Sequence, residues 1–175
     1  MEHRHSFELA LPGLAVGAVA GAAAGGLTLI AGQPAGTAAL SALLLATPLG
    51  LLGGGYGLLM SRGTIRPGLF APAGLYWLAG FPLARLVQET ALGLVLAGEV
   101  VLAGGLPGFL AYQAMVSLGF ALGFVWLHER LMPYWLLRVR GRNPRARELL
   151  GRYVAHAEVL RRTAERRRAP RKGAR

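Results

Sequence analysis

Charged side chains are missing from a long stretch near the start of the chain. No Asp, Glu, Lys or Arg occurs from Leu9 to Ser61, and most residues there are apolar. A helix needs roughly 20 apolar residues to cross a bilayer, so this stretch is long enough for two crossings. The pattern predicts membrane helices over residues 9–31 and 36–60, joined by a short uncharged turn.

Small residues recur at every fourth position within both predicted helices. Four-residue spacing keeps them near one face of a helix, and small side chains let two helix backbones approach closely inside a bilayer. The pattern predicts a glycine-zipper contact between the two helices, and it leaves open that these faces form a self-association interface or a pore. The predicted packing positions are Gly13, Gly17, Gly21, Gly25, Ala42, Ala46, Gly50 and Gly54.

Two more crossings are predicted in the second half of the apolar region. Residues 108–127 form one of them, but the preceding apolar stretch is too long for one crossing and contains several prolines. Pro72 and Pro82 are expected to interrupt a helix where they fall. We therefore predict an interfacial or re-entrant segment over residues 68–81 and a crossing over residues 82–103.

The net charge of +11 is confined to the end of the chain. Residues 1–127 hold four Arg and four Glu, whereas residues 128–175 hold fifteen Lys and Arg and four Glu, so the second range accounts for the whole excess. Flanks rich in Lys and Arg remain on the cytoplasmic side of membrane helices. We expect an all-α protein that crosses the cytoplasmic (inner) membrane four times, with both termini in the cytoplasm.

A composition change near residue 140 predicts two parts, a membrane domain over residues 1–140 and a basic cytoplasmic part over residues 141–175. Asn143 and Pro144 are the residue types favoured at the N-cap and first position of a helix, and an amphipathic pattern follows them. Residues 166–175 are expected to be disordered. Basic segments beside a bilayer attract anionic headgroups, and no motif indicates nucleic acid. The predicted lipid contacts are Arg138, Arg140 and Arg142.

Ionisable and amide side chains within a predicted crossing are candidates for function, because they are costly in lipid. Arg85 and Glu89 are interpreted as an ion pair near the cytoplasmic interface or as part of a transport path. Glu99 has apolar neighbours, and it is interpreted either as a structural hydrogen-bonding group or as a proton- or cation-handling site. The candidate polar site comprises Arg85, Gln88, Glu89, Glu99, Tyr112, Gln113 and His128.

Residue types that would indicate an enzyme or a cofactor are scarce. The chain has no cysteine, which excludes disulfides, thiolate metal sites and cysteine nucleophiles. His128 and Glu129 are adjacent, so they point about 100° apart on a helix and cannot form a catalytic dyad by themselves. We interpret them as the charged boundary of the last crossing, and we expect no cofactor and no metal site.

Three functional classes follow from these features. The first is a non-enzymatic subunit, scaffold or accessory component of a membrane complex, which would bind other membrane subunits or further copies of itself. The second is a small transporter or oligomeric channel that uses the polar stripe of the third crossing. The third is a membrane-embedded enzyme that modifies lipids, which is the least favoured because no nucleophile and base occur together.

Overall fold

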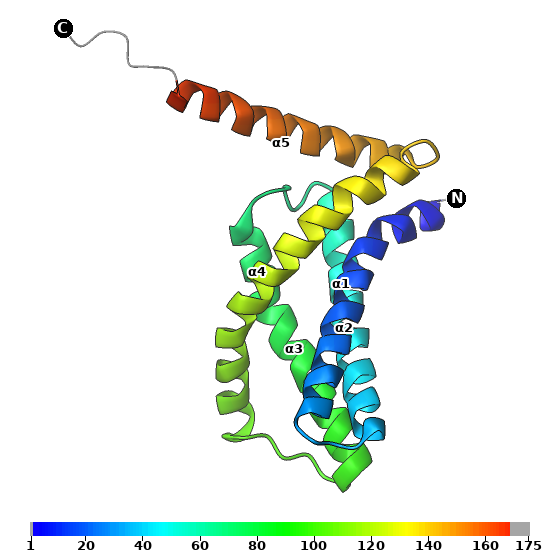
Figure 1. Cartoon of the computed structure of the whole chain (residues 1–175), viewed down its shortest axis with the longest axis vertical. Coiled ribbons are helices and arrows are strands. Elements are labelled where there is room, and N and C mark those ends of the chain that lie inside the picture. Colours follow the sequence, from blue (N-terminus) through cyan, green and yellow to red (C-terminus); the bar gives the residue numbers. More distant parts are fainter. Residues whose placement is uncertain (1, 169–175) are drawn as a thin grey trace, which may run out of the picture.

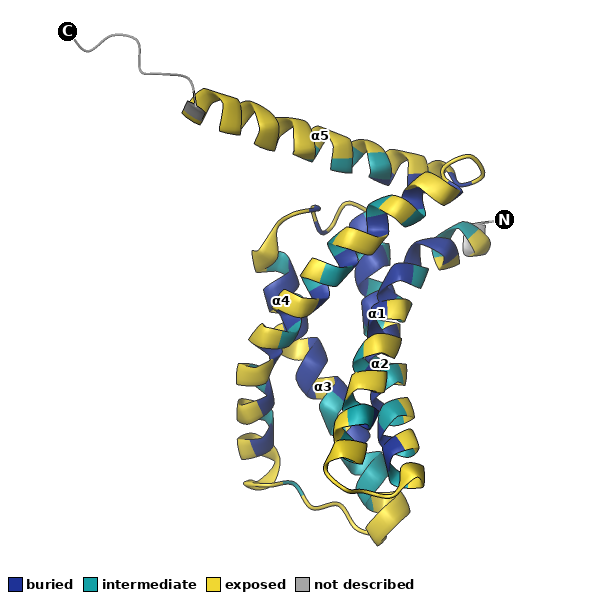
Figure 2. Cartoon of the chain, viewed as in Figure 1, coloured by how far each residue is buried: buried dark blue, intermediate teal, exposed yellow. Residues whose placement is uncertain are grey.

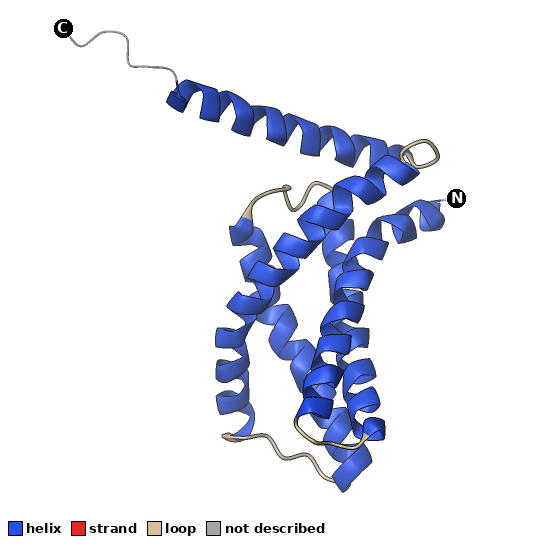
Figure 3. Ribbon diagram, viewed as in Figure 1, coloured by secondary structure: helices blue, strands red, loops and turns tan. Residues whose placement is uncertain are grey.

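Five α-helices form the computed structural model of this chain, which describes residues 2–168 and has no strand among them (Figure 3). Successive helices of the bundle run in opposite directions, so the start of α1 and the end of α4 lie at the same end, beside α5 (Figure 1). The prediction of an all-α protein is confirmed. The helices are α1 (Glu2–Ile30), α2 (Ala35–Ser61), α3 (Phe70–Ala97), α4 (Gly105–Val139) and α5 (Pro144–Arg168).

Three of the helices, α1, α2 and α4, are long and apolar enough to cross a membrane. Their outward surfaces carry many exposed Leu, Val and aromatic side chains, and burial is concentrated where the helices meet (Figure 2). These features are those of a multi-pass membrane protein. The fourth predicted crossing corresponds to α3, which has similar length but a more polar second half and is not among the three. Four crossings therefore remain a prediction.

The closest packing in the bundle joins α1 and α2 through their small residues. A methyl group added at Gly13 would overlap the backbone of Gly53, and one added at Gly17 would lie 2.7 Å from the carbonyl carbon of Leu49. Further along, a Cβ at Gly25 would lie 2.8 Å from the Cβ of Ala42. The two backbones touch along several turns, a distance that only glycine and alanine permit.

The sequence-based boundaries of the third helix were wrong. One continuous helix runs from Phe70 to Ala97, through the segment over residues 68–81 that was predicted to be interfacial or re-entrant. Pro72 is its third residue, in the first turn, where a backbone N–H has no helical partner and proline is tolerated. Pro82 removes one interior hydrogen bond, but α3 packs against both α2 and α4 and remains helical.

The fourth helix is longer than the predicted crossing over residues 108–127. It begins at Gly105 and continues through His128 and Pro133 to Val139. At 1.5 Å per residue its 35 residues exceed the roughly 30 Å thickness of a hydrocarbon core, so part of α4 extends past that thickness. The charged residues after position 127 therefore do not mark the end of the helix.

The basic helix α5 is tied to the bundle through one buried asparagine. As predicted, α5 starts at Pro144 with Asn143 as its N-cap, whose Oδ1 accepts the N–H of Ala146 at 3.2 Å. The Asn143 side-chain amide donates to the carbonyl oxygen of His5 at 2.9 Å and to Glu8 Oε2 at 3.1 Å. The first and last helices are thus joined. The prediction of disorder over residues 166–175 is wrong for residues 166–168, which belong to α5, and residues 169–175 lie outside the described residues.

A second contact between α5 and the bundle lies around Tyr153. Its hydroxyl donates to the sulfur of Met60 at 3.2 Å, and the carboxyl of Glu129 of α4 lies nearby. Burial, and then the nearby Glu129 carboxylate, raise the pKa of Tyr153, so its hydroxyl stays protonated and available as a donor. Glu129 in turn accepts the backbone N–H of Gly68 at 3.4 Å, which links the α2–α3 loop to the same junction.

Replacing Asn143 by alanine is expected to lower the free energy of unfolding by about 2 kcal/mol. The change removes the cap of α5 and leaves a buried oxygen of Glu8 short of one donor. Unfolding of the purified protein in detergent micelles measures the effect. Ser6→Ala serves as the control, because it removes only a partly buried hydrogen bond from Arg145, and we expect a change below about 0.5 kcal/mol. Equal effects of the two substitutions would contradict the assigned role of Asn143.

Candidate functional site

The polar residues of α3 lie in the middle of the helix. The prediction had placed them near the end of a crossing. Arg85 follows Phe70 by fifteen residues and precedes Ala97 by twelve. At 1.5 Å per residue, it lies about 22 Å from one end of α3 and about 18 Å from the other. Arg85 and Glu89 form an ion pair that lies near the middle of α3, and not near its end, where the predicted crossing over residues 82–103 had placed it. Charged groups in the middle of an apolar helix are candidates for function.

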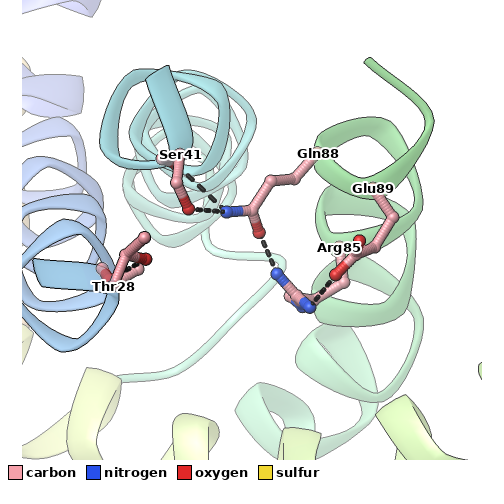
Figure 4. Close-up of polar contacts among 6 residues, drawn as sticks. Thr28, Ser41, Arg85, Gln88 and Glu89 are labelled. Carbon is pink, nitrogen blue, oxygen red and sulfur yellow. Dashed lines mark hydrogen bonds and ion pairs between the residues drawn. The ribbon is translucent and has the colours of Figure 1, made fainter. Parts of the chain in front are cut away.

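Four side chains form a connected polar cluster between α2 and α3 (Figure 4). The guanidinium of Arg85 donates to Glu89 Oε1 and to Gln88 Oε1 on its own helix. The amide nitrogen of Gln88 crosses to α2, where it donates to the hydroxyl of Ser41 at 2.9 Å and to the Ser41 carbonyl oxygen at 3.0 Å. Gln88 is 2% exposed, and its two-sided bonding fixes the position of Arg85.

The Arg85 and Glu89 side chains are not sealed inside the protein. They are 23% and 34% exposed, respectively. One cavity of about 450 Å³ reaches them from the α1–α2 side and extends to Gln33 in the turn between those helices. Its remaining wall is a mixture of hydroxyl and aliphatic groups. The lining residues are Ala24, Leu27, Thr28, Gln33, Thr37, Ser41, Arg85, Gln88, Glu89, Leu92 and Leu96.

A second cavity, of about 400 Å³, reaches the same ion pair from the α4 side. Gln113 and Tyr112 of α4 form part of its wall, and the α3–α4 loop over residues 101–103 closes one end. The ion pair of α3 therefore stands between two cavities, one on each side of the helix. Both cavities have volumes within the range of small-molecule sites.

Aromatic rings fill the bundle between the polar cluster and the end that carries α5. Trp77 is fully buried and packs on Phe120 and Phe124 of α4, with ring centroids 4.7 and 4.5 Å apart. Tyr56 of α2 meets Phe124 edge to face at 5.2 Å, and Tyr76 donates its hydroxyl to the carbonyl oxygen of Leu52 at 2.6 Å. Neither of the two cavities that reach the ion pair is lined by a residue of this region. The aromatic cluster comprises Tyr56, Tyr76, Trp77, Phe81, Phe120 and Phe124.

His128 packs against the aromatic cluster and does not contact the polar site. Its ring stacks on Phe124 with centroids 5.2 Å apart and meets Tyr56 edge to face at 5.3 Å. It is fully buried, and neither ring nitrogen has a hydrogen-bond partner among the described residues. His128 was predicted to belong to the polar site, but its ring packs against aromatic side chains instead. Its interpretation as a boundary residue of the last crossing stays a prediction, and α4 continues past it to Val139.

Glu99 also lies outside the cluster. It follows the left-handed Gly98 that ends α3, so it is in the loop, is exposed, and does not share a helix face with Arg85. No hydrogen bond from Glu99 to Gln113 or Tyr112 occurs in the described part of the chain, and Glu99 lines neither cavity. The predicted stripe therefore ends at Glu89. Gln113 and Tyr112, which were expected to be partners of Glu99, line the cavity that reaches Arg85 and Glu89.

The three arginines predicted to contact lipid have different environments. Arg142 donates from Nε to Glu8 Oε1 at 2.8 Å, and the Glu8 side chain is only 8% exposed, so this guanidinium holds a buried carboxylate. The carboxyl of Glu8 is therefore neutralised within the protein. Arg140 is exposed, whereas Arg138 lies at an apolar groove between α1 and α4. Lipid contact by all three remains a prediction.

The sequence interpretation missed the α1–α2 side of the polar site. Gln33, Thr37 and Ser41 look like isolated polar residues in an apolar region, yet all three line the larger cavity. Thr37 and Ser41 are four residues apart, so they share one face of α2, and Gln33 precedes them at the same spacing in the turn. That spacing was the signal that could have found them.

The arrangement offers hydrogen-bond donors, acceptors and both signs of charge, without a nucleophile beside a base. Among the side chains that the structure describes, residues 4–167, no group of three His, Cys, Asp or Glu could hold a metal ion. Comparisons of the chain with protein-family models, with curated proteins and with solved structures gave no match. The functional argument therefore depends on the geometry of the site.

Proposed function

We propose that this protein is a small membrane transporter or channel that binds a polar solute at the Arg85–Glu89 pair and passes it across the bilayer. The observation that supports this proposal is the location of the pair, near mid-helix and exposed to a cavity on each side. Charged groups at such depth are retained at a cost of about 2.5 kcal/mol or more unless they are paired. If these two positions had only a structural role, apolar side chains would fill it as well and would leave no cavity.

The proposed orientation places α5 and both termini in the cytoplasm. It is supported by the Arg and Lys excess after residue 127 and by Arg62 and Arg66 in the α2–α3 loop, at the same end of the bundle. The larger cavity then extends from the outer side, at Gln33, inward to Arg85. The aromatic cluster closes the path toward the cytoplasm. In this proposal the bundle is open to the outside and closed to the inside.

The chemistry of the cavity favours a small solute with both donor and acceptor groups, such as a zwitterion. Glu89 and Arg85 neutralise each other, so neither a lone cation nor a lone anion gains from the net charge of the site. A zwitterion can exchange partners with the pair, its ammonium meeting Glu89 and its carboxylate meeting Arg85. Hydroxyls of Thr37 and Ser41 add further hydrogen-bonding groups on the opposite wall.

Release to the cytoplasm requires relative motion of helices, and the packing indicates where this motion occurs. The backbones of α1 and α2 touch through their glycines, so this pair moves as one body. The contact between α2 and α3 is looser than that between α1 and α2. Among the described residues, α1 and α3 have no close backbone contact. Rocking of the α3–α4 hairpin against the α1–α2 hairpin would open the aromatic cluster and close the outer cavity, as in alternating access.

The first test measures whether water-soluble reagents reach the cavity. Because the chain has no cysteine, a single introduced cysteine is the only thiol that can react. Ser41→Cys and Leu43→Cys lie at nearly the same depth in α2, but Ser41 lines the cavity and Leu43 is 66% exposed on the outer surface. In proteoliposomes a charged, membrane-impermeant thiol reagent should modify Ser41→Cys at least tenfold faster. A thiol in lipid stays protonated and unreactive. Equal rates would remove the basis for a solute path.

Flux itself is measured with the purified protein in liposomes. Swelling under an isosmotic gradient of glycine, betaine, urea or glycerol reports solute entry, and an internal pH dye reports protons. We expect faster swelling with the zwitterions than in protein-free liposomes. Rates that match protein-free liposomes for all four solutes and for protons would contradict the proposal.

A subunit or accessory role is the second candidate, and one feature of α4 favours it. Nothing lies within 4 Å of a Cβ added at Gly119 or Gly123, which face outward beside the exposed Leu118 and Leu122. Small residues on a lipid-facing surface are suited to packing against another helix. Native mass spectrometry distinguishes the cases, since a stable complex with a different membrane protein would favour the subunit role.

A further inference from the structure

An apolar groove of about 480 Å³ lies between α1 and α4, close to the end of the bundle that carries α5. Leu11, Pro12 and Ala15 of α1 form one wall. The α4 wall consists of Leu131, Tyr134 and Trp135, and Arg138 lies beyond them. Leu131 and Arg138 are seven residues apart, so the groove is about 10 Å long along α4, apolar at the inner end and cationic at the other.

A hydrogen bond that depends on Pro12 holds one wall of this groove in place. Pro12 has no N–H, so the carbonyl oxygen of Glu8, four residues earlier, lacks its usual helical donor. The indole N–H of Trp135 donates to that oxygen at 2.6 Å. This bond fixes the Trp135 ring between the helices as a rigid apolar surface. The groove is therefore a built feature and not a loose gap between two helices.

Among the side chains that the structure describes, residues 4–167, none forms an ion pair or hydrogen bond with Arg138, in contrast to Arg142 four residues further on, which pairs with Glu8. An unpaired guanidinium above an apolar groove matches the two parts of a phospholipid, an anionic headgroup and an acyl chain. It also lies at the end of the bundle where basic residues concentrate, which is the headgroup level of the cytoplasmic leaflet in the proposed orientation.

We propose that this groove is a binding site for one anionic phospholipid, whose headgroup phosphate contacts Arg138 and whose acyl chain packs on Leu11, Ala15 and Leu131. The groove shares no lining residue with the two polar cavities. The proposed lipid site and the proposed transport function can therefore be tested, and disproved, separately. Because the lipid would bridge α1 and α4, it would stabilise the contact between the two helix hairpins.

The experiment is native mass spectrometry of the full chain in detergent micelles with added palmitoyl-oleoyl phosphatidylglycerol or phosphatidylcholine. We expect one phosphatidylglycerol molecule to be retained more tightly than phosphatidylcholine. Arg138→Gln should weaken phosphatidylglycerol binding about fivefold, the factor for one arginine near an anionic headgroup. Arg140→Gln, an exposed arginine outside the groove, should change it less than about twofold. Equal losses in the two variants would mean diffuse surface attraction and would overturn the site.

A second pair of variants tests the acyl-chain part without altering charge. Ala15→Phe fills the groove and should remove the retained phosphatidylglycerol, whereas Val19→Phe, one turn along the same helix on an exposed position, should leave it. Thermal unfolding in the same detergent checks that each variant is folded. Retention of the lipid by folded Ala15→Phe, or equal retention of both lipids by the wild-type protein, would disprove the proposal.

Discussion

Gly17→Leu is expected to lower the free energy of unfolding by more than about 3 kcal/mol, whereas Gly26→Leu in the same helix leaves it nearly unchanged. A Cβ at Gly17 already overlaps the backbone of Gly50, and the obstacle is main chain, which cannot swing aside as a side chain can. Overpacking of this kind forces helices apart and typically costs about 1–3 kcal/mol or more. At Gly26 a Cβ meets nothing within 4 Å.

The two substitutions add the same side chain to the same helix, so their difference isolates the α1–α2 contact. Both replace glycine, with its low helix propensity, by a better helix former, and the gain is similar at the two positions. Thermal or denaturant unfolding in detergent micelles provides the measurement, and cross-linking between α1 and α2 shows whether the helices have separated. A tolerated leucine at Gly17 would mean that the two helices do not pack through this face.

Glu89→Gln is expected to reduce solute flux in liposomes at least tenfold while the protein stays folded. The neutral amide no longer balances the guanidinium of Arg85, and it cannot pair with the ammonium group of a zwitterionic solute. The introduced glutamine keeps the size and hydrogen-bonding capacity of the original side chain. The loss should therefore appear in the transport rate more than in the unfolding temperature.

Glu99→Gln is the matched control for this experiment. It makes the same chemical change at an exposed glutamate in the α3–α4 loop, away from both cavities. Its flux should lie within a factor of about two of the wild-type value. If Glu99→Gln abolished flux and Glu89→Gln did not, the site described around Arg85 would be the wrong one.

The membrane class and the packing of the first two helices were readable from sequence because each depends on local spacing. Fifty-three uncharged residues leave few alternatives to crossing helices, and glycine at every fourth position identifies a helix face. The partner of α1 was also predictable, because a four-residue turn leaves α2 as its nearest neighbour. These features need no knowledge of distant contacts.

The limits of α3 depended on distant contacts and could not be read locally. Pro72 lies in the first turn of α3, where proline is tolerated, whereas Pro82 lies in the interior, where proline tends to break a helix. The helix continues through Pro82 because α3 packs against α2 and α4. The predicted helix began twelve residues too late and ended six residues too late. As a result, Glu99 was assigned to a helix face that it does not occupy, and Arg85 was placed at an interface instead of near the helix centre.

The contact of Glu8 with Arg142 and Asn143 has a consequence for biosynthesis. These residues are 134 and 135 positions away from Glu8, so they are synthesised only after α1, α2, α3 and α4. The Glu8 carboxylate in α1 therefore lacks these two partners while the four helices are being made. The first turns of α1 reach their final contacts only after α4 is complete.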